Sequence, residues 1–418
     1  MSTPGVDVSS SVRPCLSAYL SVCLGGHHSS QDVSTLSPSP LSTLPSTSPV
    51  LGVYGGCDQY HGAPALCSLA ARALGVCSVI HASGKAVPIQ ALTPQSEVHL
   101  VTSTDASSVY TDRDRETPIT SQDSRPRIHD AKSPCCTPPP LGAVCIGTGL
   151  GRDIHGLVLF LMGCREAQRH NVPLILDGDA LWHLAQLCSL PDVSDVPAVS
   201  AVGSETEGEA DHDSMYTHPL RSDVVHSLSQ TEVVLTPNWP ELNRLSMACL
   251  GRKASNPNTP MDAETVGESG PYTSDCEDLS RQLGCTVLQK GPVDIVCHRG
   301  TVIGYLDSPS APVRCAGQGD VLAGLVGSMA AQRHILLLQK HREETPKDGK
   351  GYVATPGPLS AQDAEVTAVP SLPDVTLMAC HLMRATASRV ADRMGIGMIA
   401  SDIPPQIERE VANLVKGV

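Results

Sequence analysis

The chain has 418 residues, a formal net charge of −14 at pH 7, and 41% hydrophobic residues against only 3% aromatic ones. This acidity argues against nucleic acid or an anionic membrane as a partner and favours small molecules. With a single Phe in the chain, the core must be built from Val, Leu, Ile, Ala and Cys.

The 16 cysteines show no Cys-x-x-Cys spacing. Several of them, such as Cys67, Cys145 and Cys297, lie inside apolar runs, where a free thiol behaves as a small hydrophobic group. Zinc sites need closely paired ligands, which this spacing lacks. The pattern predicts free thiols in a reducing compartment, so we expect a cytoplasmic protein. No run reaches the ~18 apolar residues that span a bilayer, and the N-terminus lacks a signal-peptide pattern.

The N-terminal part of the chain divides into a polar tail and a first structural unit. Residues 1–50 are rich in Ser, Pro and Thr, a composition that buries little apolar area and predicts a disordered tail. A strand is expected at 51–54, followed by a glycine turn and a helix with Pro64 in its first turn. Gly75 ends the helix, and residues 76–80 form the next strand. This βαβ order predicts a parallel sheet.

The rest of the chain repeats short apolar runs that end in glycine-rich or charged turns. The expected fold is an α/β doubly wound, mostly parallel sheet with helices on both faces, in one catalytic domain over 51–418. Ligands should bind where its strands end. Further strands are expected at 98–101, 143–146, 172–176, 232–235 and 286–289, a hairpin at 294–305, a helix at 377–393, and polar insertions near 102–140, 191–222, 252–275 and 341–373.

Two motifs follow neighbouring strands in the middle of the chain. The turn Gly147-Thr148-Gly149-Leu150-Gly151 is suited either to cradle a phosphate or to let a strand pack tightly against a helix. Its glycine spacing does not match the Gly-x-Gly-x-x-Gly of dinucleotide-binding turns. Asp177 and Asp179 would bind Mg²⁺ through water, orient a polar ligand, or only cap the next helix.

Two further motifs follow the later strands. Asn238 offers hydrogen-bond donors and an acceptor, and Glu241 would hold a magnesium-bound water, unless the pair only caps a helix. Lys290-Gly291 would place an ammonium group or backbone N–H groups on nucleotide phosphates. The alternative for Lys290 is a solvated side chain at a strand end.

The turn Gly317-Gln318-Gly319-Asp320 opens a strongly apolar helical pattern. Its two glycines let successive N–H groups converge on an anion at the helix N-terminus. Asp320 would then face a neighbouring hydroxyl as the base for phosphoryl transfer to an alcohol. The alternative is that Asp320 only caps the helix.

In this order the motifs resemble the ATP- or ADP-dependent NAD(P)H-hydrate dehydratases, of the carbohydrate-kinase type within the ribokinase-like superfamily. Thr148, Gly178 and Ala316 stand where the family usually has Pro, Ala and Gly, and its leading helix is not recognisable in residues 1–50. Gln318 and the Leu-Gln-Lys-Gly run resemble the corresponding residues of the eukaryotic, ATP-using branch of the family. The resemblance covers residues 51–103, 141–190, 231–250, 283–333 and 374–410.

This resemblance implies repair of hydrated NADH or NADPH. ATP phosphorylates the ring hydroxyl, Asp320 accepts its proton, and phosphate is then expelled. Mg²⁺ is expected to assist, and a homo-oligomer is left open. The implied substrate-binding residues are Gly149, Asn238, Trp239, Pro240, Glu241, Leu242, Asn243, Arg244 and Asp320. The implied ATP-binding residues are Lys290, Gly291, Pro292, Val293, Asp294, Ser310, Ala311, Pro312, Val313, Arg314, Cys315, Ala316, Gly317, Gln318 and Gly319.

Two other functions stay open from the sequence. A small-molecule kinase of the same superfamily would use the same aspartate base but release a stable phosphate ester. A non-catalytic nucleotide-binding protein is the second, and the presence of Asp320, Lys290 and both glycine turns argues against it.

Overall fold

The computed structural model describes residues 8–24, 49–83, 86–93, 96–100, 141–190, 218–255, 273–312, 314–344 and 369–416. Within them, nine strands form one sheet in the order β3-β2-β1-β4-β5-β6-β7-β8-β9. β3 to β7 pair in parallel, whereas β8 and β9 add antiparallel at one edge, which confirms the predicted sheet. The strands are β1 (Val50–Tyr54), β2 (Cys77–Ala82), β3 (Glu97–Leu100), β4 (Leu141–Ile146), β5 (Leu174–Leu176), β6 (Val233–Leu235), β7 (Thr286–Gln289), β8 (Asp294–His298) and β9 (Thr301–Leu306).

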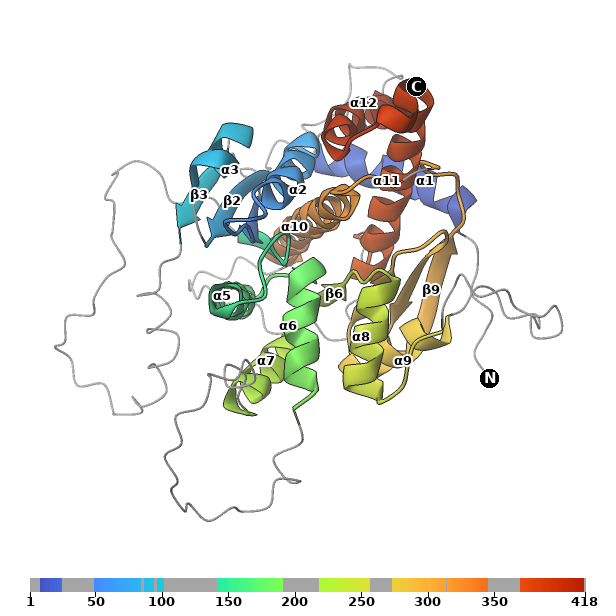
Figure 1. The fold of residues 1–418 in the computed structure, drawn as a ribbon. Helices are drawn as coiled ribbons and strands as arrows, with labels where there is room; N and C mark the ends of the chain where they lie inside the picture. Colours follow the sequence, from blue (N-terminus) through green and yellow to red (C-terminus); the bar gives the residue numbers. More distant parts are fainter. Residues whose placement is uncertain are drawn as a thin grey trace, which may run out of the picture.

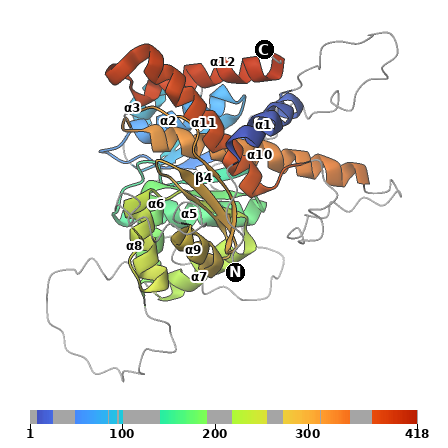
Figure 2. The same cartoon turned by 90° about the vertical axis from the view of Figure 1, so that its right-hand side faces the viewer.

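Helices cover both faces of this sheet (Figures 1 and 2). One face packs against α1, α2, α3, α10, α11 and α12, and the other against α5 to α9. The helices are α1 (Ser9–Cys23), α2 (Gly62–Ala73), α3 (Ala86–Leu92), α5 (Ile154–His170), α6 (Gly178–Cys188), α7 (His218–Gln230), α8 (Trp239–Leu250), α9 (Ser274–Leu283), α10 (Gln318–Glu344), α11 (Leu372–Met394) and α12 (Ile403–Lys416).

Side chains of β4 contribute to two hydrophobic cores, one on each face of the sheet. Ala143 and Cys145 are buried against the α10 face, and Val144 and Ile146 are buried against the α5 face. Successive side chains of a strand point to opposite faces, so a strand covered on both sides must be apolar throughout. The core is aliphatic and Cys-rich, as the composition predicts, and Phe160 is fully buried within it.

The order of the strands reverses between β1 and β4. From β1 the chain adds β2 and β3 on one side of the sheet and then continues with β4 on the other side. At such a switch point the connections leave in opposite directions, and a crevice forms beyond the carboxyl ends of the two strands. The fold therefore provides a ligand site beyond β1 and β4.

The prediction of a disordered tail over residues 1–50 is wrong for residues 8–24. They form α1, whose Leu16 and Leu20 are fully buried against the α10 face of the sheet. The Tyr19 hydroxyl donates to the Met329 carbonyl of α10 at 2.6 Å. Buried side chains at positions 12, 16, 19 and 20 make a helical stripe that the Ser-rich composition concealed.

Leu20 allows the contribution of α1 to stability to be measured. We expect Leu20→Ala to lower the free energy of unfolding by about 2–5 kcal/mol, the usual cost of removing a fully buried leucine side chain. Val22, 45% exposed on the same helix, supplies the control, because Val22→Ala should change stability by less than about 0.5 kcal/mol. Urea unfolding of both variants measures the difference, and equal stabilities would mean that α1 does not dock.

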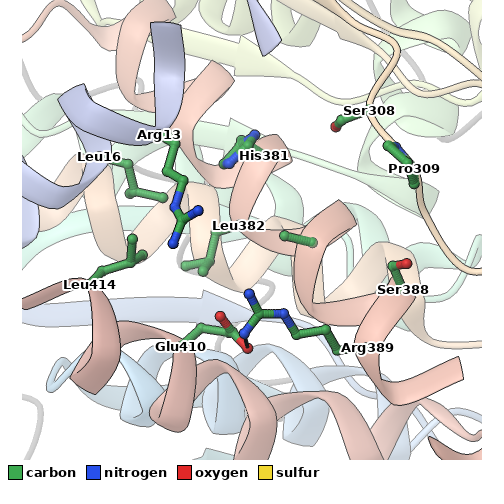
Figure 3. Close-up of a pocket in the computed structure, with 11 residues that line it drawn as sticks. Arg13, Leu16, Ser308, Pro309, His381, Leu382, Ser388, Arg389, Glu410 and Leu414 are labelled. Atoms are coloured by element: carbon green, nitrogen blue, oxygen red, sulfur yellow. Dashed lines mark hydrogen bonds and ion pairs between the residues drawn. The ribbon is translucent and has the colours of Figure 1, made fainter. Parts of the chain in front are cut away.

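A small cavity of about 300 Å³ lies where α1 meets α11, α12 and the segment after β9 (Figure 3). Arg13 and Leu16 reach it from α1, and His381 and Leu382 from α11. Arg389 of α11 pairs with Glu410 of α12 beside it. Through these contacts the N-terminal helix joins the two C-terminal helices in one layer.

The predicted insertions fall mostly outside the described residues, and there they stay predictions. At their edges, α7 takes up residues 218–222, α9 begins at Ser274, α10 runs to Glu344 and α11 begins at Leu372. Residues 1–7 and 25–48 of the predicted tail also lie outside the described part of the chain.

No membrane-spanning run was predicted from the sequence, yet α10 is long and apolar enough to cross a membrane. Among the described residues, Gln318–His341 alone meets that test of length and composition. Most of this stretch is buried inside the protein, where α10 packs against β4 and α2. Burial in the core accounts for its apolar composition.

Candidate active site

A cleft of about 1090 Å³ opens beyond the carboxyl ends of β1, β4 and β5, at the point where the strand order reverses. Residues 57–60 after β1 and residues 147–153 after β4 form two of its walls. Asp179 of α6, Glu241 of α8 and Asp320 of α10 also line it. The cleft thus joins four predicted motifs, the glycine turn of residues 147–151 and the motifs that contain Asp179, Glu241 and Asp320.

Asp320 lies in the first turn of α10, half-buried, and its side chain lines the cleft. Burial and the nearby charge of Asp177 raise its pKa to about 7, although Lys290 opposes the shift. A carboxyl group that titrates near neutral pH is suited to accept a proton from a hydroxyl. The raised pKa of this carboxyl group and its position at the cleft wall are therefore compatible with its predicted role as a base.

The turn before Asp320 requires glycine. Gly317 has φ +93°, and a Cβ there would lie 2.4 Å from Leu66 Cδ1 and 2.9 Å from Ala400 Cβ. Its ideal Cβ position is also only 3.8 Å from Asp320 Oδ2. The C-terminal segment around Ala400 therefore packs on the back of this turn and fixes it beside the aspartate.

Lys290 and Asp177 form a buried ion pair beside the same turn. The Lys290 Nζ lies 2.6 Å from Asp177 Oδ1, and their side chains are 13% and 5% exposed. An ideal Cβ on Gly319 would lie 3.5 Å from the Lys290 Nζ, which places the ammonium group at the start of α10. Burial alone would lower the pKa of Lys290, but Asp177 and Glu241 raise it above its ordinary value. The solvated-lysine alternative is therefore wrong.

Asp177 occupies the N-cap position of α6 without capping it. Its side chain makes no cap hydrogen bond. Instead, Asp177 Oδ1 accepts from the Thr236 hydroxyl at 2.6 Å as well as from Lys290. Of the interpretations that the sequence left open, the helix cap is wrong for Asp177, whose carboxylate binds Lys290.

Asn238 and Glu241 do form the helix cap that the sequence allowed. Asn238 Oδ1 accepts from the Glu241 N–H at 3.1 Å, and Glu241 Oε2 accepts from the Asn238 N–H at 2.9 Å. Glu241 nevertheless lines the cleft. Burial raises its pKa above the ordinary value, with Lys290 opposing and Asp177 reinforcing the shift. Glu241 therefore fixes the start of α8 and also faces the site.

The other residues of the predicted substrate segment lie away from the cleft lining. Leu242 is buried in the core, which corrects its prediction as a substrate contact. Asn243 Oδ1 accepts from the Ala254 N–H at 3.0 Å, and the Trp239 indole donates to the Ser255 carbonyl at 3.0 Å. Pro240 is exposed and Arg244 half-buried. Of residues 238–244, Glu241 alone lines the cleft.

Gly149, the remaining predicted substrate residue, does line the cleft. It has φ +63°, and a Cβ there would lie 2.8 Å from the Tyr60 carbonyl oxygen. Glycine at this position therefore lets the turns after β1 and β4 meet.

Arg384 of α11 connects the predicted ATP-binding segment of residues 290–294 with the chain just before the second one, residues 310–319. Its guanidinium donates to the Ser308 carbonyl at 2.7 Å, to the Pro292 carbonyl at 2.8 Å and to Asp294 Oδ2 at 3.1 Å. Asp294 Oδ1 accepts from the Gly291 N–H at 3.0 Å. The Asp294 carboxylate is thus turned into the protein and shapes the loop of residues 290–293. Arg384 was not among the residues predicted from the sequence.

The remaining predicted ATP-binding residues lie between that loop and the glycine turn. Residues 310–312 and 314–319 are described, whereas Val313 lies outside the described residues. Ala311 and Cys315 pack against the core, and Pro312, Arg314 and Ala316 are exposed. Their contact with ATP stays a prediction.

Several cleft residues, among them Tyr60 and Arg152, were not assigned a site role from the sequence, and Asp179 was assigned only a magnesium, polar-ligand or capping role. Tyr60 is 56% exposed in the cleft wall. Asp179 accepts from the Gly151 N–H at 3.0 Å and from Arg152 Nε at 2.9 Å. The signal that could have found them is their position, since each lies in or next to a turn that follows a strand.

A metal site formed by the protein alone is not found in the described part of the chain. No group of three or more His, Cys, Asp or Glu side chains there could hold a metal ion. Asp177 and Asp179, the predicted magnesium pair, are bonded to Lys290 and Arg152.

A parallel α/β sheet with a Gly-x-Gly-Asp turn and a buried lysine at its ligand edge defines a protein of the carbohydrate-kinase class. The family model described as NAD(P)H-hydrate dehydratase matches residues 51–196 and 210–355. The chain belongs to this family.

Curated relatives are similar over most of the chain. The ATP-dependent (S)-NAD(P)H-hydrate dehydratase of Aspergillus fumigatus is 26% identical, over 87% of this chain and 88% of its own length. The Emericella nidulans protein of the same name is 28% identical over 87% of each chain. A solved structure of the Bacillus subtilis ADP/ATP-dependent NAD(P)H-hydrate dehydratase has 15% identity and a TM-score of 0.47, with 87% of this chain and 89% of that chain covered.

Proposed function

We propose that the chain uses ATP to dehydrate hydrated NADH and NADPH, restoring the reduced coenzymes. The observation that carries this proposal is Asp320, a carboxyl group with its pKa raised to about 7, at the wall of a cleft large enough for a dinucleotide. The family and the names of the curated relatives support the same reaction.

The chemistry explains why ATP is needed. Hydroxide is a poor leaving group, so the ring hydroxyl first attacks the γ-phosphorus of ATP while Asp320 accepts its proton and ADP departs. The N–H groups of the turn at residues 317–319 stabilise the negative charge on the moving phosphoryl group. The lone pair of the ring nitrogen then expels phosphate, and loss of a proton from the adjacent carbon restores the double bond.

In this reaction Lys290 supplies a fixed positive charge at the phosphates. Its ammonium group lies beside the glycine turn, and Asp177 holds it there. The Arg384 contacts with Ser308 and Pro292 link the predicted ATP-binding segment of residues 290–294 to the chain that leads into residues 310–319. ATP would therefore meet a preorganised binding surface.

Mg²⁺ is part of the proposal and would arrive with ATP. Glu241 and Asp320 face the cleft, and nearby carboxylates contribute to raising the pKa of each. Such carboxylates fit a hard divalent cation, which keeps several waters and binds one or two carboxylates plus phosphates. Bound Mg²⁺ would neutralise phosphate charge, with Glu241 holding one of its waters.

The raised pKa of Asp320 predicts the pH dependence of the reaction. The base must be ionised, so kcat/KM for hydrated NADH should rise about tenfold per pH unit below about pH 7 and level off above it. Initial rates between pH 5.5 and 8.5, at a fixed subsaturating ATP concentration, measure the profile. A flat profile over this range would show that the group does not act with this pKa.

The proposed function is tested by adding ATP or ADP, side by side, to purified protein and hydrated NADH. We expect the dihydronicotinamide absorbance to return with ATP. Failure of both nucleotides to restore it would reject the proposal. The kinase alternative predicts a phosphate ester that accumulates instead.

A cytoplasmic location and a homo-oligomer belong to the same proposal. All cysteines in the described residues are free thiols, which suits a reducing compartment. Met394, Ile396 and Ile399 are 44%, 95% and 58% exposed between α11 and α12, an apolar corner that self-association would cover. Cell fractionation and analytical ultracentrifugation measure the two properties.

A further inference from the structure

The lining of the cleft has few positively charged side chains for the dinucleotide substrate that it is proposed to bind. A dinucleotide carries a pyrophosphate, and the phosphorylated coenzyme carries a further phosphate on the ribose. Among the described lining residues, Arg152 is the one Arg or Lys, with His155 the other side chain able to carry positive charge. The carboxylates of the lining are Asp58, Asp153, Asp179, Glu241 and Asp320.

Arg152 is held in place from two sides. Its Nε donates to Asp179 Oδ1 at 2.9 Å, and its Cζ lies 5.6 Å from the centroid of the Trp182 ring. Asp179 is itself fixed, because Asp179 Oδ2 accepts from the Gly151 N–H at 3.0 Å. The Arg152 side chain is still 56% exposed, and its two terminal nitrogens have no hydrogen-bond partner in the described part of the chain.

We propose that Arg152 binds a phosphate of the hydrated dinucleotide, an assignment that rests on the proposed function. Asp179 binds the Nε of Arg152, and the Trp182 ring lies over its guanidinium group. The edge of the guanidinium group that carries the two terminal nitrogens is therefore left for a ligand. That edge matches two phosphate oxygens, a geometry that lysine cannot reproduce. Asp179 and Trp182 are positioning residues, because they act on the substrate through Arg152.

Two phosphates could occupy this edge, and the two coenzymes distinguish them. The pyrophosphate is common to hydrated NADH and NADPH, whereas the 2′-phosphate occurs only in hydrated NADPH. We expect Arg152→Gln to raise KM by about 10–100-fold, the range for a lost hydrogen bond to a charged group, with kcat changed less than about threefold. An equal rise for both substrates assigns the pyrophosphate, and a rise for hydrated NADPH alone assigns the 2′-phosphate.

A binding measurement separates this inference from the proposed activity. Calorimetric titration with ADP-ribose and 2′-phospho-ADP-ribose requires no turnover. We expect Arg152→Gln to weaken binding of at least one of them by a factor similar to the change in KM, and Arg152→Lys to recover only part of the loss. Asp179→Asn, which removes a charged anchor of the guanidinium group, should raise KM with little change in kcat.

Arg72 supplies the matched control. It is 52% exposed and pairs with Glu408 at 3.0 Å on the surface, so Arg72→Gln removes a similar charge without touching the cleft. It should leave KM and both titrations unchanged. If Arg152→Gln keeps its melting temperature and binds both ligands as the unmodified protein does, the assignment of Arg152 is wrong, whether or not the protein dehydrates the coenzyme. If the unmodified protein binds them through Arg152 but restores no NADH, the proposed function fails and the phosphate site stands.

Discussion

Replacing Asp320 by Asn is expected to lower turnover by roughly 10²–10⁴-fold while the protein still folds, the usual range for loss of a general base. Asn has nearly the same shape as Asp but cannot accept the proton of the substrate hydroxyl. Turnover with hydrated NADH and ATP measures the loss. The matched control is Asp58→Asn, an exposed carboxylate of the same cleft that should keep turnover within a few fold.

The stability of the Asp320→Asn variant gives a second prediction that does not depend on turnover. Burial and Asp177 raise the pKa of Asp320 in the folded protein to about 7, above its ordinary value of 3.8. Ionising this carboxyl group therefore costs folding stability, and the cost grows as the pH rises from about 4 to about 7. The Asn variant should be at least as stable as the original protein at pH 8.

Near-normal turnover in the Asp320→Asn variant would mean that another group is the base.

Replacing Lys290 by Met is expected to impair both ATP use and folding. The change leaves Asp177 buried and unpaired, which costs about 3–5 kcal/mol when a buried pair loses one partner. It also removes the charge proposed to bind the phosphates, so kcat/KM for ATP should fall by at least about 100-fold. Urea unfolding and ATP-dependent kinetics measure the two effects.

The double variant Asp177→Asn/Lys290→Met separates these two effects. Removing the unpaired charge of Asp177 should recover most of the lost stability but none of the ATP use. The exposed pair Arg72–Glu408 gives the comparison, since Arg72→Met should cost less than about 1 kcal/mol. Recovery of ATP use in the double variant would show that Lys290 is only structural.

Local sequence patterns predicted the sheet and the position of the cleft. Apolar runs that end in glycine turns indicated parallel strands, and the order of the motifs placed Asp320 and Gly149 at one edge. Residues 8–24 were missed because the average composition of the N-terminal region hides four buried side chains at helical spacing. Composition averaged over 50 residues therefore predicts this helix less well than the spacing of apolar residues between positions 12 and 20.

Contacts between distant residues could not be predicted in the same way. Asp177 has the local pattern of a helix cap, and its actual partner Lys290 lies 113 residues further along the chain. Arg384 lies in the middle of α11 and reaches Asp294, 90 residues earlier. For Asn238 and Glu241 the local rule was sufficient, because a capping box needs only three residues of separation.

The most direct test of the central claim is the phosphorus balance of the reaction, measured by ³¹P NMR alongside the dihydronicotinamide absorbance. We expect one ADP and one inorganic phosphate to appear for each NADH restored from its hydrate. A phosphate ester that accumulates while the absorbance stays low would contradict the dehydratase account and establish a kinase.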